Sequence, residues 1–268
     1  VFLRRQAAEH EQLLLHYQPK VEMKSGAIHQ VEALIRWQHP QRGVLPPDEF
    51  LPLAEESGLM KSLSQWVLNE AIRQCRAWDR DGIHLRVAVN LSMRDLQDTQ
   101  LPQRIAGLLM AWGLDAVSLE VELTETAIAA DMEKTHQSLI ELHRMGVRIA
   151  IDDFGTGYSS LAHLRQLPVD TVKIDKSFVQ GLTKNENDAA IVRATIELGH
   201  NLGLHVVAEG VEDQTTWDAL ATLGCDLVQG YLVSRPLPAA ALQHWLGGTS
   251  GQMPPMVANA SSLRQQGR

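Results

Sequence analysis

The sequence is poor in cysteine and contains no long hydrophobic run. Its two cysteines, Cys75 and Cys225, lie far apart without the spacing of a zinc site, so we expect buried thiols in a reducing compartment. No apolar run approaches the roughly 20 residues that cross a bilayer, and the start has no signal-peptide pattern. We therefore expect a cytoplasmic domain that makes no membrane contact, whatever anchors a longer protein elsewhere.

Basic residues are outnumbered as well. The 24 lysines and arginines stand against 32 acidic residues, which gives a formal net charge of -8. This balance argues against a general nucleic-acid footprint and against binding to anionic membrane surfaces. It does not exclude a small anionic ligand, because metals, Lys or Arg can hold a phosphate locally.

The two ends differ in composition from the middle of the chain. An amphipathic, charged start predicts a linker helix over residues 1–14, joined to an upstream domain in a longer protein. From Gly247 onward the chain is rich in Gly, Ser, Gln and Pro, which predicts a disordered tail over residues 247–268. Residues 15–246 are enough for one large domain with its own core.

Short strand-like runs alternate with helical runs throughout this domain. Such alternation is typical of a parallel sheet with crossover helices, and eight strands predict a closed α/β barrel of the (β/α)8, TIM-like class. The predicted strands are residues 16–21, 28–36, 86–91, 118–123, 148–152, 171–175, 205–209 and 227–231, and the predicted helices are residues 61–78, 101–112, 131–144, 188–202, 213–223 and 238–245.

The connection between the first two strands is unusually short. Only the residues around 22–26 separate them, whereas a parallel crossover needs a dozen or more. The first strand must therefore run antiparallel to the second. Gln18 and Glu32 lie seven residues either side of Ser25, so the hairpin places them opposite each other at one mouth of the barrel.

The stretch from Arg148 to Gly157 is a strand that leads into two carboxylates and a glycine turn. The glycines let the turn direct the side chains of Asp152 and Asp153 to one point, where two anions repel each other unless a cation lies between them. Taken alone, this motif is as compatible with an Asx-type helix cap beside a solvated neighbour.

Every other strand also carries a polar residue near its end. Since the active site of this fold lies at the C-terminal ends of the strands, we expect these residues to share one rim. The candidate metal ligands there are Glu32, Asn90, Glu122, Asp152, Asp153 and Glu209. All are oxygen donors, which favours Mg²⁺ or Mn²⁺ over zinc, and five carboxylates suit two ions better than one.

Paired metals favour phosphoryl chemistry. Lys173 would stabilise developing phosphate charge or hold a nucleophilic water, and Arg36 would reach a substrate phosphate. Gln18 and Gln229 either orient the ligand or satisfy backbone groups. The alternative for the acids is an ion-pair network in the barrel core, in which Lys173 merely neutralises Asp175 or other acidic neighbours.

The segment Glu32 to Trp37, EALIRW, resembles the signature of the EAL-domain family of bacterial cyclic di-GMP phosphodiesterases, and the resemblance spans roughly Leu15 to Leu242. Further segments agree in order: NLS at 90–92, ELTE at 122–125, DDFGTG at 152–157, KID at 173–175, EGVE at 209–212 and QGY at 229–231. The resemblance implies a barrel with an antiparallel first strand, and hydrolysis of one phosphodiester bond of cyclic di-GMP to linear pGpG by two-metal-assisted attack of water.

The resemblance also implies roles for single residues. It assigns Glu32, Asn90, Glu122 and Asp152 to one metal, and Asp152, Asp153 and Glu209 to the second. Lys173 would orient or help to activate water, Glu125 would steady the loop after Asp153, and Glu209 would act as a ligand or a general base, of which we favour the ligand. The expected substrate contacts are Gln18, Leu34, Arg36, Asp175 and Gln229.

Partners follow from the same resemblance. It implies a homodimer formed through residues 154–157 and the helix after them, and fusion to an upstream sensory or GGDEF-type domain. Two other functions stay open: a catalytically silent cyclic di-GMP receptor, although such relatives usually lack ligands that are all filled here, and a metal-dependent barrel hydrolase acting on another phosphoester.

Strand parity predicts a second layer inside the barrel. If Asn90, Glu122 and Asp152 point inward, then Arg86, Glu120 and Arg148, each an even number of residues earlier, point inward too. Buried charges without partners are severely destabilising, so we expect these three side chains to bond one another below the site.

Overall fold

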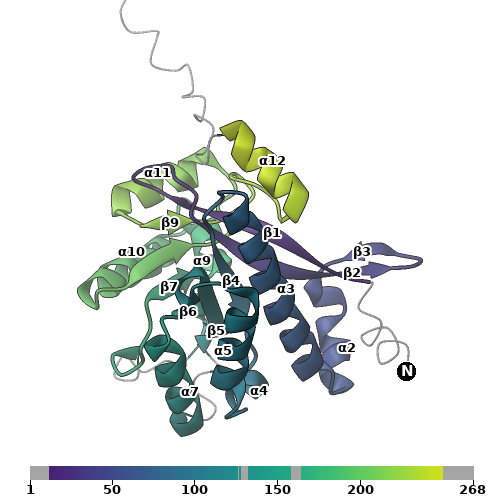
Figure 1. Cartoon of the computed structure of the whole chain (residues 1–268). Helices are drawn as coiled ribbons and strands as arrows, with labels where there is room; N and C mark the ends of the chain where they lie inside the picture. Colours follow the sequence, from purple (N-terminus) through teal and green to yellow (C-terminus); the bar gives the residue numbers. More distant parts are fainter. Residues whose placement is uncertain (1–11, 126, 128–131, 158–163, 250–268) are drawn as a thin grey trace, which may run out of the picture.

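The computed structural model describes residues 12–125, 127, 132–157 and 164–249, and its core is a closed barrel (Figure 1). The first strand pairs antiparallel with the strands on both of its sides, and every other neighbouring pair around the barrel is parallel. The predicted barrel with an antiparallel first strand is therefore confirmed. Its strands, in chain order, are β1 (Leu13–Glu22), β2 (Gln30–His39), β4 (Arg86–Asn90), β5 (Leu119–Thr124), β6 (Arg148–Phe154), β7 (Thr171–Ile174), β8 (His205–Ala208) and β9 (Leu227–Val228).

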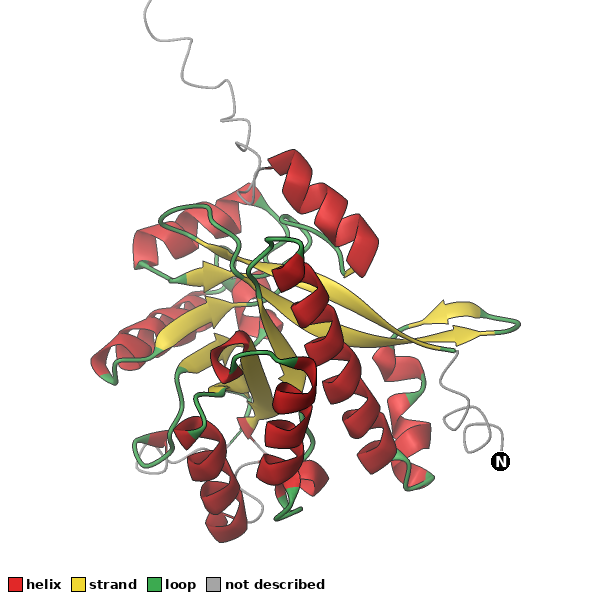
Figure 2. Ribbon diagram, in the orientation of Figure 1, coloured by secondary structure: helices red, strands yellow, loops and turns green. Residues whose placement is uncertain are grey.

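Helices surround this barrel on the outside (Figure 2). All six predicted helices are present: α3 (Met60–Arg80), α5 (Leu101–Trp112), α7 (Met132–Arg144), α10 (Glu186–Asn201), α11 (Gln214–Leu223) and α12 (Ala239–Thr249). The elements that we did not predict are too short for a periodic pattern: β3 (Gly43–Leu45), η1 (Pro47–Glu49), α2 (Leu51–Glu56), α4 (Met93–Leu96), η2 (Ala116–Ser118), α9 (Lys176–Gly181) and β10 (Leu237–Pro238).

Alternation along the strands separates the helix-facing core from the barrel interior. Apolar residues such as Val121 and Ile149 are fully buried in the core. On the interior side, the small Ala88 pairs in register with Glu120, and Ala150 pairs with Glu122. Small residues beside long ones leave space for charged side chains inside the barrel.

The register of the hairpin brings the first two site residues together. Gln18 and Glu32 are direct Cα partners of β1 and β2, as predicted. On the opposite side, β6 and β7 lose their regular register between Ile151 and Phe154, and Asp153 within this irregularity has a φ of 53°. The left-handed backbone conformation of Asp153 changes the direction of the chain at the end of β6.

Both predicted boundaries of the domain need correction. β1 begins at Leu13, which pairs with Trp37, so the last residues of the predicted linker helix 1–14 belong to the sheet. At the other end, α12 continues to Thr249, because Leu242 and Leu246 are buried and anchor it; residues 247–249 are therefore helical and not part of a disordered tail. Residues 1–11 and 250–268 lie outside the described part.

The predictions from scarce residue types can also be compared with the structure. Cys75 and Cys225 are free and buried, as expected. Within the described residues, no helix combines the length and the apolar character that crossing a membrane requires.

Candidate active site

A buried lysine lies at the centre of the predicted site. Lys173 on β7 is fully buried, and its Nζ lies 2.6 Å from Glu122 Oε2, 2.6 Å from Glu209 Oε1, 3.1 Å from Asp152 Oδ1 and 3.8 Å from Glu32 Oε2. Burial lowers the pKa of Lys173, but these carboxylates raise it well above its usual value. Lys173 is therefore an ammonium ion that bridges carboxylates from β2, β5, β6 and the residue after β8.

Glu122 is clamped between two lysines. Its Oε2 accepts from Lys173, and its Oε1 accepts a 2.6 Å hydrogen bond from Lys20, which is fully buried on β1. Burial raises the pKa of Glu122, but Lys173 and Lys20 outweigh this effect and bring it to about 2. Lys20 also donates to Glu120 Oε1 at 2.7 Å. We call Lys20, Glu120 and Glu122 the barrel floor.

The floor corrects the predicted cluster of Arg86, Glu120 and Arg148. Glu120 is buried in the interior as expected, but its partner is Lys20. Arg86 Nε donates to the carbonyl of Val117 at 3.0 Å, and the half-exposed Arg148 pairs with Asp170.

Position along the strand explains the error. Arg86 and Arg148 are the first residues of β4 and β6, where long side chains leave the barrel toward solvent. A signal for Lys20 was present in the sequence, because it lies two residues after Gln18 on β1 and so faces the same interior.

Three carboxylates gather on the other side of Lys173. Oxygens of Asp152, Asp153 and Glu209 all lie within 4.8 Å of one another, and we call these residues the acidic cluster. The amide N–H of Asp153 donates to Asp152 Oδ1 at 3.0 Å and fixes the turn that aims both carboxylates at one point. The predicted convergence is present, and it suits a cation better than an Asx cap.

The electrostatics of the acidic cluster are incompletely compensated. Burial raises the pKa of Glu209 to about 8, and nearby Asp152 and Glu32 add to the effect against the opposing Lys173. Burial, Asp152 and Asp175 similarly raise the pKa of Asp153 to about 6. Mutual repulsion of this kind is relieved when a positive ion binds among the oxygens.

A chain of amides holds the remaining predicted ligand, Glu32. Its Oε1 accepts from Asn90 Nδ2 at 2.6 Å, and its Oε2 accepts from Gln229 Nε2 at 2.6 Å. Gln229 also donates to Gln18 Oε1 at 3.1 Å, while Gln18 donates to the backbone carbonyl of Ser234 at 3.0 Å. The two glutamines thus orient Glu32 and satisfy a backbone group, and both also line the cavity described below.

Glu125 lies beside the loop that follows Asp153, as expected. It is buried, and its Oε2 accepts hydrogen bonds from the backbone N–H groups of Gly155 at 3.1 Å and Gly157 at 3.3 Å. A Cβ at Gly157 would lie only 3.0 Å from Glu125 Cδ, so the close approach requires glycine. The helix that we expected to follow, with its dimer contacts, falls on residues outside the described part.

A cavity of about 510 Å³ opens over this site. Its lining includes four of the predicted residues at the strand ends together with Leu34 and Gln229, and adds residues that sequence reasoning did not select. The added polar and aromatic side chains are Lys176, Gln180, Glu212 and Tyr231. These residues are exposed and lie on loops or on the short α9, so no periodic pattern in the sequence indicated that they line a cavity.

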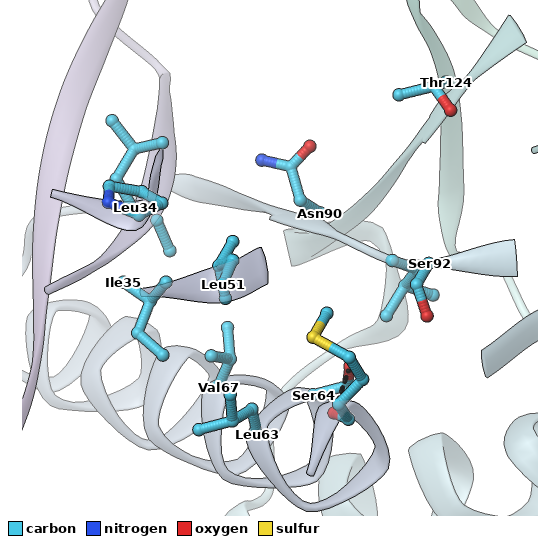
Figure 3. A pocket seen from close by; sticks show the side chains of 13 residues that line it. Leu34, Ile35, Leu51, Leu63, Ser64, Val67, Asn90, Ser92 and Thr124 are labelled. Carbon is cyan, nitrogen blue, oxygen red and sulfur yellow. Dashed lines mark hydrogen bonds between the residues drawn. The ribbon is translucent and has the colours of Figure 1, made fainter. Parts of the chain in front are cut away.

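A second cavity of about 240 Å³ shares Leu34 with the first. Figure 3 shows the side chains that line this second cavity. Apolar side chains of β2, α2 and α3 line it, and Asn90, Ser92 and Thr124 bring polar groups from the ends of β4 and β5. The expected substrate contacts therefore differ in position: Leu34 lines both cavities, whereas Arg36 and Asp175 are not among the described residues lining either.

Both of those residues have local partners. Arg36 is half-buried and donates to the carbonyl of Ile35 at 2.9 Å. Asp175 caps α9 by accepting from the N–H of Ser177 at 3.0 Å. Asp175 also shares a side-chain hydrogen bond with Asp153 of the acidic cluster. A role in binding substrate stays a prediction for both residues.

Fold and site together define an α/β-barrel protein with an oxygen-rich, acidic centre at the C-terminal ends of its strands, a class that holds divalent cations. Residues 3–236 match the EAL domain, and the chain belongs to the EAL domain family.

Two curated relatives from Pseudomonas aeruginosa are similar over most of the chain. The bifunctional diguanylate cyclase/cyclic di-GMP phosphodiesterase MucR is 46% identical over 240 residues, which cover 89% of this chain and 35% of MucR. The cyclic di-GMP phosphodiesterase NbdA is 46% identical over 243 residues, covering 90% of this chain and 31% of NbdA. The chain therefore spans about a third of the length of these relatives.

Solved structures are similar as well. The PaMucR phosphodiesterase in complex with c-di-GMP superposes with a TM-score of 0.87 at 45% identity, covering 90% of this chain and 98% of that one. The FimX EAL domain from Pseudomonas aeruginosa bound to c-di-GMP gives a TM-score of 0.81 at 27% identity, covering 88% of this chain and 95% of that one.

Proposed function

We propose that this chain is a cyclic di-GMP phosphodiesterase, which hydrolyses one phosphodiester bond of the cyclic dinucleotide to give linear pGpG. The observation that carries the proposal is the gathering of the predicted metal ligands beside the 510 Å³ cavity: four of their carboxylates contact Lys173, Asn90 bonds one of these four, Glu32, and Asp153 lies in the acidic cluster. The names of the relatives MucR and NbdA support the choice of substrate.

The residues present fit two divalent cations. The site and the floor together hold six carboxyl groups, those of Glu32, Glu120, Glu122, Asp152, Asp153 and Glu209, against the two ammonium groups of Lys20 and Lys173, so four negative charges would remain uncompensated with every carboxyl group ionised. Two divalent ions would cancel that charge, and the donor set, with Asn90, is all oxygen, which suits Mg²⁺ or Mn²⁺. When bound, such ions supply a Lewis acid for the phosphate oxygens and make water more acidic.

The ligands would divide into two sets. One ion would be held by Glu32, Asn90, Glu122 and Asp152, and the second by the acidic cluster, with Asp152 shared. We assign Glu209 to the ligand role, since its oxygen already belongs to a group that can surround an ion. Lys173, being protonated, would not accept a proton. Glu122, Glu209 and Asp152 lie within hydrogen-bond distance of its Nζ, so it would donate to a water or a phosphate oxygen once a bound ion draws one of these carboxylates away.

The two cavities would receive different parts of the substrate. The larger one, with polar walls above Lys173, is the place for the scissile phosphate and the sugars. The smaller, apolar one beside Leu34 suits a flat purine base, and Asn90, Ser92 and Thr124 there offer hydrogen-bonding partners. Gln229 also lines the larger cavity, and its Oε1 is buried without a hydrogen-bond partner.

The proposal extends to partners. We infer that the domain forms a homodimer and is joined to a sensory or GGDEF-type domain, and the second inference is supported by the bifunctional name and the greater length of MucR.

The test is an assay of the purified chain with cyclic di-GMP, first in EDTA and then with Mg²⁺ or Mn²⁺, with products separated by chromatography. We expect pGpG only when a divalent ion is present. Glu32→Ala should abolish turnover while part of the substrate affinity remains. Tight binding without any metal-dependent pGpG would overturn the proposal in favour of a silent receptor.

A further inference from the structure

Lys20 lies directly beneath the proposed metal site. It is fully buried on β1, and its Nζ lies 2.6 Å from Glu122 Oε1 and 2.7 Å from Glu120 Oε1. It is absent from the described lining of both cavities around Leu34. Any effect of Lys20 on the reaction must therefore pass through another residue.

Glu122 is the residue through which it would act. Lys173 bonds Glu122 Oε2, but it also bonds Glu209 and Asp152, so its position depends on the whole site. Lys20 contacts the other oxygen, Oε1, and its second partner, Glu120, lies in the floor. The bond from Lys20 is thus the one that ties Glu122 to the barrel wall independently of the strand-end carboxylates.

Neutralising Glu120 does not by itself account for a lysine here. Glu120 Oε2 is buried without a hydrogen-bond partner, so the pair is imperfectly satisfied. Replacing a buried ion pair by apolar side chains of similar volume is often neutral or stabilising. If only stability mattered, apolar side chains at positions 20 and 120 would serve at least as well as the ion pair.

We propose that Lys20 is a positioning residue for Glu122. By holding Oε1 against the barrel wall, it keeps Oε2 turned toward the strand ends, in the place where a divalent cation would be bound. The proposal rests on the proposed function, since it requires that Glu122 is a metal ligand. Partners that orient a ligand in this way typically change metal affinity by about 10- to 100-fold when they are lost.

A pair of variants of the 268-residue chain tests this role. Glu120→Met removes the floor acid but leaves Lys20 bonded to Glu122. Lys20→Met/Glu120→Met then removes one charge of each sign, so the net charge of the site stays the same as in the wild type, and Glu122 keeps its ion pair with Lys173. Binding of Mn²⁺ is measured by calorimetry, and thermal unfolding is measured in EDTA.

We expect Glu120→Met to bind Mn²⁺ like the wild type, and the double variant to unfold at a similar temperature in EDTA but to bind Mn²⁺ about 10- to 100-fold more weakly at one site. Equal affinity in the two variants would overturn the proposal. A double variant that no longer folds would also overturn it, because Lys20 would then be needed for the barrel itself.

The wild type separates this proposal from the proposed function. If the wild-type chain bound no Mn²⁺, the proposed metal centre would be wrong, and the role of Lys20 would fall with it. If the wild type bound Mn²⁺ and produced pGpG while the two variants matched, only the role of Lys20 would be wrong.

Discussion

The barrel floor and the acidic cluster both place carboxylates inside the barrel, yet they differ in charge balance. In the floor, Lys20 contacts both Glu120 and Glu122, and Lys173 bonds the other oxygen of Glu122, so two lysines face two carboxylates and all four side chains are fully buried. In the acidic cluster, burial together with repulsion from neighbouring carboxylates raises the pKa of Glu209 to about 8 and that of Asp153 to about 6. Buried carboxylates whose charge is balanced by lysines can remain in the folded interior without another ion. Carboxylates whose charge is not balanced, as in the acidic cluster, favour the binding of a cation.

The largest effect is expected when the lysine of the barrel floor is removed. Lys20→Met alone removes the ion-pair partner of the buried Glu120 and leaves Glu122 with Lys173 only. Removing one partner of a buried pair costs about 3–5 kcal/mol, so we expect the free energy of unfolding to fall by that amount. Urea titration in EDTA measures the loss, and the added change Glu120→Met should restore most of it. A single variant as stable as the wild type would contradict the account.

The corresponding change in the acidic cluster should act on activity instead of stability. Asp152→Asn keeps the size of a ligand shared by the two proposed ions but removes its charge. We expect turnover of cyclic di-GMP to fall at least about 100-fold. Stability in EDTA should change by less than about 1 kcal/mol, since the weaker contact with Lys173 is offset by less repulsion from Asp153 and Glu209.

These two effects are told apart by measuring turnover with saturating Mn²⁺ beside urea titration of the same sample. Full activity in Asp152→Asn would remove the shared-ligand assignment. A large loss of stability would show that the acidic cluster is a structural ion-pair network.

The unbalanced cluster also predicts a pH dependence of stability. The folded-state pKa of Glu209 is raised by burial from 4.5 to about 8, so the folded protein keeps a proton that the unfolded chain has released. Its contribution to stability is complete below pH 4.5 and is lost as the pH rises toward 8. In EDTA we expect the free energy of unfolding to fall across this window, and Glu209→Gln to flatten the slope.

Bound metal supplies the control. With Mn²⁺ present, Glu209 should be ionised in the folded state, and the fall between pH 4.5 and 8 should shrink. The same slope with and without Mn²⁺ would argue that the ion does not bind at the acidic cluster.

A smaller effect is expected one step away from the acidic cluster. Glu125→Ala removes the acceptor for the N–H groups of Gly155 and Gly157, so the turn after Asp153 loses its support. We expect turnover to fall about 10- to 100-fold with little change in the affinity for cyclic di-GMP. Glu125→Gln keeps an acceptor oxygen and should retain more activity than the alanine variant. Equal losses in the two variants would indicate that the charge of Glu125, and not its contact with the loop, is what matters.

Sequence alone predicted the parts of this molecule that follow from periodicity and strand order. The antiparallel hairpin, with Gln18 opposite Glu32, followed from a connection too short for a crossover. The meeting of Glu122, Asp152 and Glu209 around Lys173 followed from the ends of parallel strands.

Sequence reasoning missed features that depend on how far along the barrel axis a side chain lies and on contacts between elements distant in the sequence. Alternation along a strand predicts which face a residue occupies, but not how far along the barrel axis its side chain lies. Arg86 and Arg148 were therefore predicted inside the barrel, whereas at the barrel end their side chains turn toward solvent. The partner of Glu120 was missed because Lys20 comes from the antiparallel strand, on which later residues lie deeper in the barrel. The apolar cavity beside Leu34 depends on the packing of α2 and α3, which carries no motif.

The smallest expected effect concerns Arg148, at the end of the barrel where strand alternation gave a wrong prediction. Arg148 is 43% exposed and pairs with Asp170, whose carboxylate also accepts from the N–H of Ile149. An exposed ion pair contributes about 0–1 kcal/mol, so Arg148→Ala should lower the free energy of unfolding by less than about 1 kcal/mol and leave turnover unchanged. Urea titration and the pGpG assay measure the two quantities. A loss comparable to that of Lys20→Met would mean that Arg148 shares the charge of the floor after all, and the contrast between a closed interior and an open mouth would no longer hold.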